Sequence, residues 1–130
     1  MKILQPPGWA PPKGYSNGVA ARGTYVAIGG QIGWNADQAF ASDDFVEQAR
    51  QALENVVAVL AEAGGRPEHI VRMTWYVVDA DEYVAALRDL GRAYREVIGR
   101  HYPAMTAVEV SRLIEARAKV EIEATAVVPD

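Results

Sequence analysis

The hydrophobic residues between positions 44 and 63 recur every three or four residues. Ser42 or Asp44 can cap the start of this stretch, and Asp44 with Glu47 has the spacing of a capping box. Gly64 and Gly65 can end it. The repeating apolar positions are Phe45, Ala49, Ala52, Leu53, Val56, Leu60 and Ala63. This pattern predicts an amphipathic helix of about 20 residues.

A second helix is predicted over residues 81–100. Its apolar positions, again at helical spacing, are Val84, Leu87, Leu90, Tyr94, Val97 and Ile98. On the polar side, Arg92 is spaced to pair with Asp89 and with Glu96. The arginines of this helix are interpreted most simply as a solvated face: Arg88, Arg92, Arg95 and Arg100.

Strands are predicted where β-branched and aromatic residues gather. These stretches are 18–22 (a weak candidate), 24–32, 70–78, 105–113 and 118–128. Because residues 114–117 are few enough for a hairpin, the last two strands are predicted to be antiparallel neighbours. The order β-β-α-β-α-β-β predicts an α+β fold, with a mixed sheet and two helices on one face. A single domain spans residues 1–130, led by a proline-rich extended arm at 5–14.

The last strand alternates, which places Glu121 and Glu123 on the face opposite its apolar residues. The same alternation adds Glu109 from the preceding strand. Like charges there need water, a cation or protonation, so this face is either an open hydrated surface or the lining of a cleft in an oligomer. The pair Gly29–Gly30 inside a strand marks either a plain bulge or a close approach by a ligand or a neighbouring chain.

Composition narrows the chemistry. The 130 residues include no cysteine, which excludes disulfides, iron–sulfur clusters and thiol catalysis, and only two histidines, which argues against a multi-histidine metal site. With 13 basic and 17 acidic residues the net charge is −4, which disfavours nucleic acid and anionic membranes as partners. No apolar run is long enough to span a membrane, and the N-terminus lacks the pattern of a signal peptide. A cytoplasmic location is therefore expected.

Several stretches together carry a resemblance to a known family. They are GYSNGV, GGQIGWN, QARQALENVVAVLAEAGG, IVRMTWYVVD, HYPAMTAVEVSRL and KVEIEATAVV. The chain resembles the RidA/YjgF family, also called L-PSP endoribonuclease-like. The resemblance implies a chorismate-mutase-like fold assembled as a homotrimer, with sheets inside, helices outside and small-molecule clefts between subunits. It also implies hydrolysis of reactive enamines and imines, such as 2-aminoacrylate, to a ketoacid and ammonia without a cofactor.

The resemblance assigns roles to residues that this chain retains. Glu121 in the strand reading VEIEA corresponds to a glutamate thought to position or activate water. Tyr15 corresponds to a tyrosine of the cleft, and Thr106 is expected at the cleft beside it.

Three other positions depart from the family pattern. Met105 stands where active members carry the arginine of a PAR tripeptide, which binds the substrate carboxylate with two hydrogen bonds. Gly29 stands in place of a serine, and Gly91 in place of an asparagine. Losing the arginine removes about 1.5–3 kcal/mol of charge-assisted binding. A substrate without that contact, or a carboxylate held by another arginine such as Arg72 or one of the second helix, is therefore expected.

Three functions follow from these observations. The first is a divergent deaminase that is weak or inactive on 2-aminoacrylate because of Met105. The alternative is a non-catalytic trimer that binds a small molecule, as a regulator for example. An endoribonuclease is a third possibility, against which the acidic chain and the missing basic patch argue.

Overall fold

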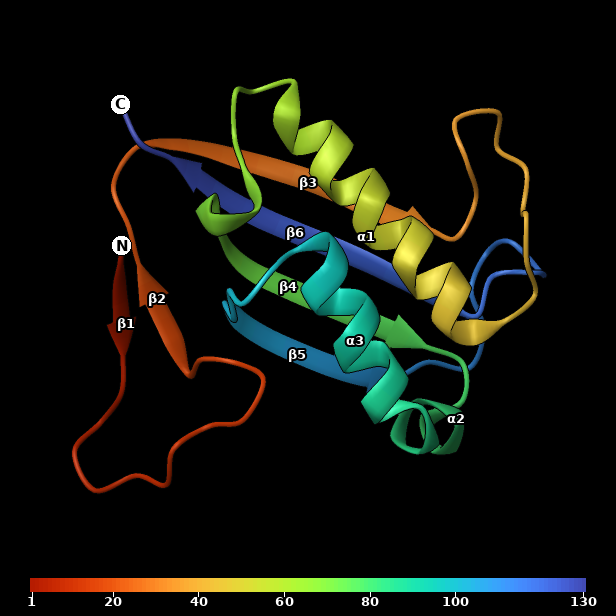
Figure 1. The fold of residues 1–130 in the computed structure, drawn as a ribbon, viewed down its shortest axis with the longest axis horizontal. Coiled ribbons are helices and arrows are strands. Elements are labelled where there is room, and N and C mark those ends of the chain that lie inside the picture. The colour runs from red at the N-terminus through yellow and green to blue at the C-terminus, as the bar shows by residue number, and fades with distance from the viewer.

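The computed structural model describes residues 1–130, and its main layer is a four-stranded sheet with the strand order β3-β6-β4-β5. A small two-stranded sheet, β1-β2, lies to one side (Figure 1). The elements are β1 (Lys2–Leu4), β2 (Gly18–Ala20), β3 (Thr24–Ile32), α1 (Phe45–Ala61), a 3-10 turn (Pro67–His69), β4 (Ile70–Val77), α2 (Ala80–Ala85), α3 (Leu87–Val97), β5 (Ala104–Glu109) and β6 (Val120–Val128). The predicted α+β class, with a mixed sheet and helices on one face, is confirmed.

The first predicted helix forms as α1. The Asp44 side chain accepts a hydrogen bond from the Glu47 backbone N–H at 3.0 Å, which caps the helix as the sequence indicates. After the helix, Gly64 has a φ of 73°, a left-handed conformation that glycine adopts without strain. The apolar face of α1 packs on the sheet and buries residues such as Leu53, Val56 and Leu60 completely.

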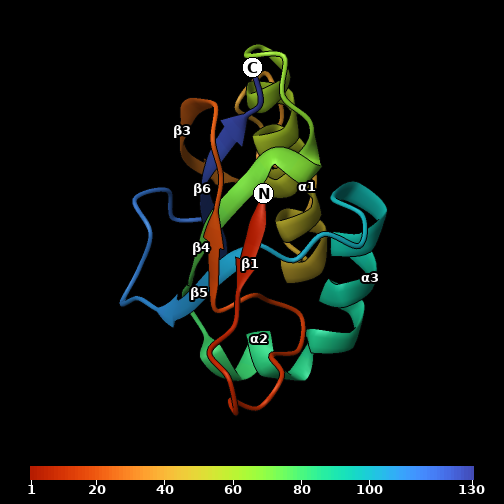
Figure 2. The ribbon, with the colours of Figure 1, turned by 90° about the vertical axis from the view of Figure 1, so that its left-hand side faces the viewer.

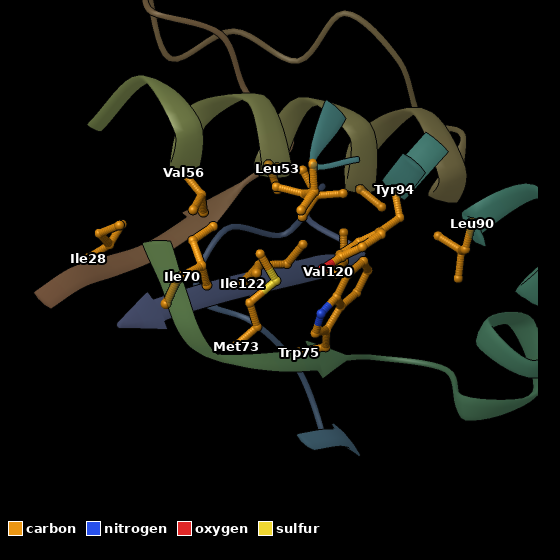
Figure 3. Close-up of a cluster of buried hydrophobic side chains, with 14 of the residues drawn as sticks. Ile28, Leu53, Val56, Ile70, Met73, Trp75, Leu90, Tyr94, Val120 and Ile122 are labelled. Atoms are coloured by element: carbon orange, nitrogen blue, oxygen red, sulfur yellow. The ribbon is translucent and has the colours of Figure 1, made fainter. Parts of the chain in front are cut away.

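The core lies between the sheet and the helices α1 and α3 (Figure 3). The strand β6 supplies Val120, Ile122, Ala124 and Ala126 to it, so the alternation predicted for the last strand is confirmed. Figure 2 shows the sheet edge-on, with α1 and α3 on one side and the loop between β5 and β6 on the other. The sheet therefore has an inner face covered by helices and an outer face that the chain leaves open.

The predicted hairpin between the last two strands is wrong. The strand β4 lies between β5 and β6, pairing parallel with β5 and antiparallel with β6. Two causes act together. The crossover through α2 and α3 brings the chain back beside β4 in the same direction, and the apolar side of β6 is buried so completely that this strand takes a central place in the sheet. The strand β5 also ends at Glu109, four residues earlier than predicted.

This topology separates Glu109 from Glu121 and Glu123, so the predicted cluster of three carboxylates does not form. The Glu109 carboxylate accepts a hydrogen bond from the Ala80 N–H at 2.9 Å, at the start of α2. Glu121 and Glu123 do share the outer face, where they alternate with the buried residues of β6.

The second predicted helix is broken into α2 and α3 at Ala86, whose ψ of 4° is outside the helical range. One of the two ion pairs predicted for Arg92 of this helix forms. Arg92 lies 4.0 Å from Asp89, whereas Glu96 pairs with Arg50 of α1 instead. None of the helices combines the length and the hydrophobicity needed to cross a membrane.

The N-terminal arm is held against the sheet. The strand β1, which the sequence analysis did not predict, pairs antiparallel with β2. Farther along, Ser16 lies beside Ala104 at the free edge of β5, and its backbone N–H donates to the Pro103 carbonyl at 3.0 Å. The Ser16 hydroxyl donates to the carbonyl of Tyr102. The arm therefore passes along the outermost strand of the main sheet.

Candidate ligand-binding site

A cavity of about 520 Å³ lies where the N-terminal arm, the edge strand β5 and the helices α2 and α3 meet. Such a volume is typical of sites that bind small molecules. The residues that line it are Lys13, Gly14, Tyr15, Trp75, Tyr83, Leu87, Leu90, Gly91, Tyr94, Arg95, Tyr102, Met105, Thr106 and Ala107.

Aromatic rings form much of the wall. Trp75 and Tyr83 meet edge to face at 6.4 Å between ring centroids, and Tyr94 stacks on Tyr102 at 5.6 Å. Figure 3 shows Trp75, Leu90 and Tyr94 together at one end of the core. Burial raises the pKa of the Tyr83 and Tyr94 phenols, so both stay uncharged at neutral pH. The wall is therefore apolar with few polar points.

The indole N–H of Trp75, one of the residues of this wall, is buried and has no hydrogen-bond acceptor in the chain. An unpaired donor of this kind costs about 1–3 kcal/mol.

The only charged residues that line the cavity are Lys13 and Arg95, and neither lies within ion-pair distance of a carboxylate. A Cβ atom added at Gly91 would lie 3.2 Å from the Nη1 of Arg95. The guanidinium of Arg95 therefore lies over Gly91, one helical turn back along α3. Arg95 is exposed, as its interpretation as part of a solvated face predicts, and it borders the cavity as well.

Four of the six site residues expected from the sequence line this one cavity. They are Tyr15 from the arm, Gly91 from α3, and Met105 with Thr106 from β5. Met105 is half-buried and packs against the core. The other two, Gly29 and Glu121, do not line it.

Glu121 lies on the outer face of the sheet, next to the glycine pair of β3. The pairing of β3 with β6 shifts register between Ile28 and Gln31, so the glycines do form a bulge. A Cβ atom at Gly30 would lie 2.0 Å from the Oε2 of Glu121, whereas one at Gly29 would meet nothing within 4 Å. The close approach at this bulge is therefore made by the carboxylate of Glu121.

The outer face is polar around Glu121. The Tyr76 hydroxyl donates a hydrogen bond of 2.6 Å to Glu123, and this bond raises the pKa of Tyr76. Arg72 is also exposed on this side of β4. Within one chain the sheet separates Glu121 from Met105, because the two lie on strands that flank β4 and on opposite faces.

Sequence reasoning missed the aromatic wall and Lys13, and it named the arginines of the second helix as a group without singling out Arg95. The spacing of Gly91 and Arg95 is a signal that they share one helix face, but nothing in it shows that the arm of Lys13 and Tyr15 returns to that face. No three His, Asp or Glu side chains gather where they could hold a metal ion.

Comparisons with known proteins agree with one another. Residues 8–128 match the model of the family described as Endoribonuclease L-PSP. The chain is 35% identical over 108 residues to the 2-iminobutanoate/2-iminopropanoate deaminase of Salmonella typhimurium, covering 81% of this chain and 80% of that protein.

Two solved structures are similar over 98% of both chains. The Rid-family protein YyfB of Yersinia pestis is 30% identical with a TM-score of 0.86. The protein TdcF of E. coli, solved with bound serine, is 32% identical with a TM-score of 0.70.

Proposed function

The chain belongs to the endoribonuclease L-PSP family, that of RidA and YjgF, and on this premise we propose that it hydrolyses the C=N bond of small enamine or imine metabolites. The observation that carries this proposal is the meeting of Tyr15, Gly91, Met105 and Thr106, from three separate segments, at one apolar cavity. The deaminase name of the Salmonella relative supports it.

The reaction needs one water molecule and no cofactor. Water adds to the carbon of the C=N bond and forms a carbinolamine, whose C–N bond then breaks to release ammonia and leave a carbonyl. A carboxylate that takes the proton from water and returns it to the nitrogen accelerates both steps. Glu121 is the proposed carboxylate, since no acidic residue lines the cavity itself.

Glu121 reaches a cavity only if a second copy of the chain supplies it. We propose a homotrimer in which the outer sheet faces turn toward one another, so that the Glu121 of one copy enters the cavity of its neighbour. Large apolar side chains exposed on this side support such an assembly: Tyr25 is 68% exposed, Val108 is 42% exposed, and Ile114, in the loop between β5 and β6, is 97% exposed.

We propose further that the site is not specialised for 2-aminoacrylate. Met105 offers a thioether where the resemblance implies a guanidinium, and Gly29 leaves open space where it implies a hydroxyl. These two features favour a second candidate function, a trimer that binds a small molecule without turnover.

Release of ammonia separates the two functions. Imines are generated in the assay from a panel of amino acids, and their hydrolysis is followed with wild type, Glu121→Gln and a control, Glu54→Gln, on the exposed side of α1. We expect Glu121→Gln to lower kcat/KM by about a hundredfold and Glu54→Gln to change nothing. If the wild-type trimer releases ammonia no faster than buffer from every imine, the binding function replaces the enzymatic one.

A further inference from the structure

The charge of the cavity is opposite to that of the chain. Acidic residues outnumber basic ones by 17 to 13 overall, yet within one chain the cavity is lined by two cations and no carboxylate. In an apolar surrounding, positive charges without partners favour an anionic ligand group.

The carboxylates nearest to Arg95 along α3 are already engaged. Glu96, the next residue, pairs with Arg50 of α1 at 2.5 Å. Asp89, which precedes Arg95 on the same helix, lies 4.0 Å from Arg92. These pairs leave the guanidinium of Arg95 free over the cavity, and the missing side chain of Gly91 leaves room for it there.

The rest of the cavity has a different character. Trp75, Tyr83, Tyr94 and Leu90 contribute uncharged surface, and Met105 adds a flexible apolar side chain. A volume of about 520 Å³ is far larger than a three-carbon imino acid needs. The cavity therefore fits a ligand that joins one anionic group to a bulky apolar or aromatic body.

We propose that Arg95, assisted by Lys13, binds the carboxylate of the substrate and so determines specificity, and that the substrates are carboxylates with a large apolar or aromatic side chain. The proposal rests on the proposed function only in taking this cavity as the substrate site. The guanidinium of Arg95 on α3 then makes the two parallel hydrogen bonds to the carboxylate that the resemblance expects of an arginine at position 105.

Equilibrium binding of stable probes tests this without any turnover. Calorimetry compares 3-phenylpropanoate, its neutral amide 3-phenylpropanamide, and propanoate, on wild type, Arg95→Gln and the control Arg88→Gln. Arg88 is an unpaired arginine of the same helix that does not line the cavity. We expect wild type to bind 3-phenylpropanoate at least tenfold more tightly than either other probe, and higher salt to weaken this binding.

The variants decide the role of Arg95. We expect Arg95→Gln to raise the Kd for 3-phenylpropanoate about tenfold, to leave that for the amide unchanged, and to bind the acid no better than the amide. Arg88→Gln should bind like wild type. The proposal is overturned if the two variants have the same Kd for the acid, if the amide binds as tightly as the acid, or if wild type binds none of the probes.

The two proposals fail separately. Binding that depends on Arg95 in a protein that releases no ammonia contradicts the proposed enzymatic function and keeps the role of Arg95. Ammonia release that is abolished in Glu121→Gln but unchanged in Arg95→Gln keeps the enzymatic function and rejects the role of Arg95.

Discussion

Replacing Gly30 with alanine would move the Glu121 carboxylate while leaving that glutamate in the chain. The added Cβ would lie 2.0 Å from the Oε2 of Glu121, 2.8 Å from its Cδ and 3.0 Å from its Cγ. Since Cβ atoms do not come so close to other atoms, the carboxylate must rotate away. The backbone can stay in place, because Gly30 does not have a positive φ and the clash is with a flexible side chain.

The change in stability is expected to be small. An alanine in a strand interior is about 0.5–1 kcal/mol more favourable than a glycine, because the unfolded chain has less freedom to lose. Forcing Glu121 out of its rotamer costs about 0.5–1.5 kcal/mol. The two nearly cancel, so the melting temperature should stay within about 5 °C of the wild-type value.

The rate of imine hydrolysis, in contrast to the stability, should fall strongly in Gly30→Ala. If the carboxylate acts from its observed position, kcat/KM for imine hydrolysis in Gly30→Ala falls about as far as in Glu121→Gln, roughly a hundredfold. The assay is ammonia release from the best imine of the panel, with melting temperature and oligomeric state measured on the same sample. A stable Gly30→Ala trimer with wild-type turnover would refute the role given to the Glu121 carboxylate.

Three further changes probe the cavity, the fold and the ionisation of its wall. Met105→Arg should raise kcat/KM for 2-aminoacrylate roughly tenfold to a hundredfold, from about 1.4–3 kcal/mol of added binding, and more when combined with Gly29→Ser; an inert, well-folded double variant would show that this is not a disabled deaminase site. Asp44→Ala removes the cap of α1 and should cost about 1 kcal/mol in the free energy of unfolding, measured with urea; an unchanged midpoint would contradict the role of the cap. Burial raises the pKa of Tyr94 above its ordinary value of 10.0, so its contribution to stability is complete below pH 10 and declines above it. Tyr94→Phe should therefore lose less stability than wild type between about pH 10 and 12. Parallel curves of unfolding free energy against pH for the two proteins would exclude Tyr94 as the titrating group.

The elements that depend on local pattern could be predicted from the sequence. The repeat of α1 and its cap at Asp44 are both visible in neighbouring residues, and so is the alternation that puts Glu121 on the outer face. The pairing of β5 with β4 could not be predicted, because it depends on how the crossover through α2 and α3 returns to the sheet. A short loop between two strands allows a hairpin but does not require one.

The candidate site, too, could be predicted only in part from the sequence. The resemblance led to Tyr15, Gly91 and Met105, and the structure brings them to one cavity. The sequence offered the arginines of the second helix both as a solvated face and as candidates to bind a carboxylate, but it could not single out Arg95, because its place on α3 gives no sign of the arm that lines the same cavity. That arm is held by contacts with Tyr102 and Pro103, which are more than 80 residues away in the sequence.

The central claim is that the cavity of one copy works with the Glu121 of another. Mixing two inactive variants tests it most directly: Glu121→Gln, with an intact cavity, and Ala107→Trp, with its own Glu121 but a large side chain in the cavity lining. The two are unfolded together in equal amounts and refolded, with each variant refolded alone as the control. The account predicts that, after random reassembly of equal amounts, roughly a third of the sites in mixed trimers and a quarter of all sites pair an intact cavity with an intact Glu121, so that about a quarter of wild-type ammonia release returns. Mixed trimers that stay as inactive as either variant alone would contradict it.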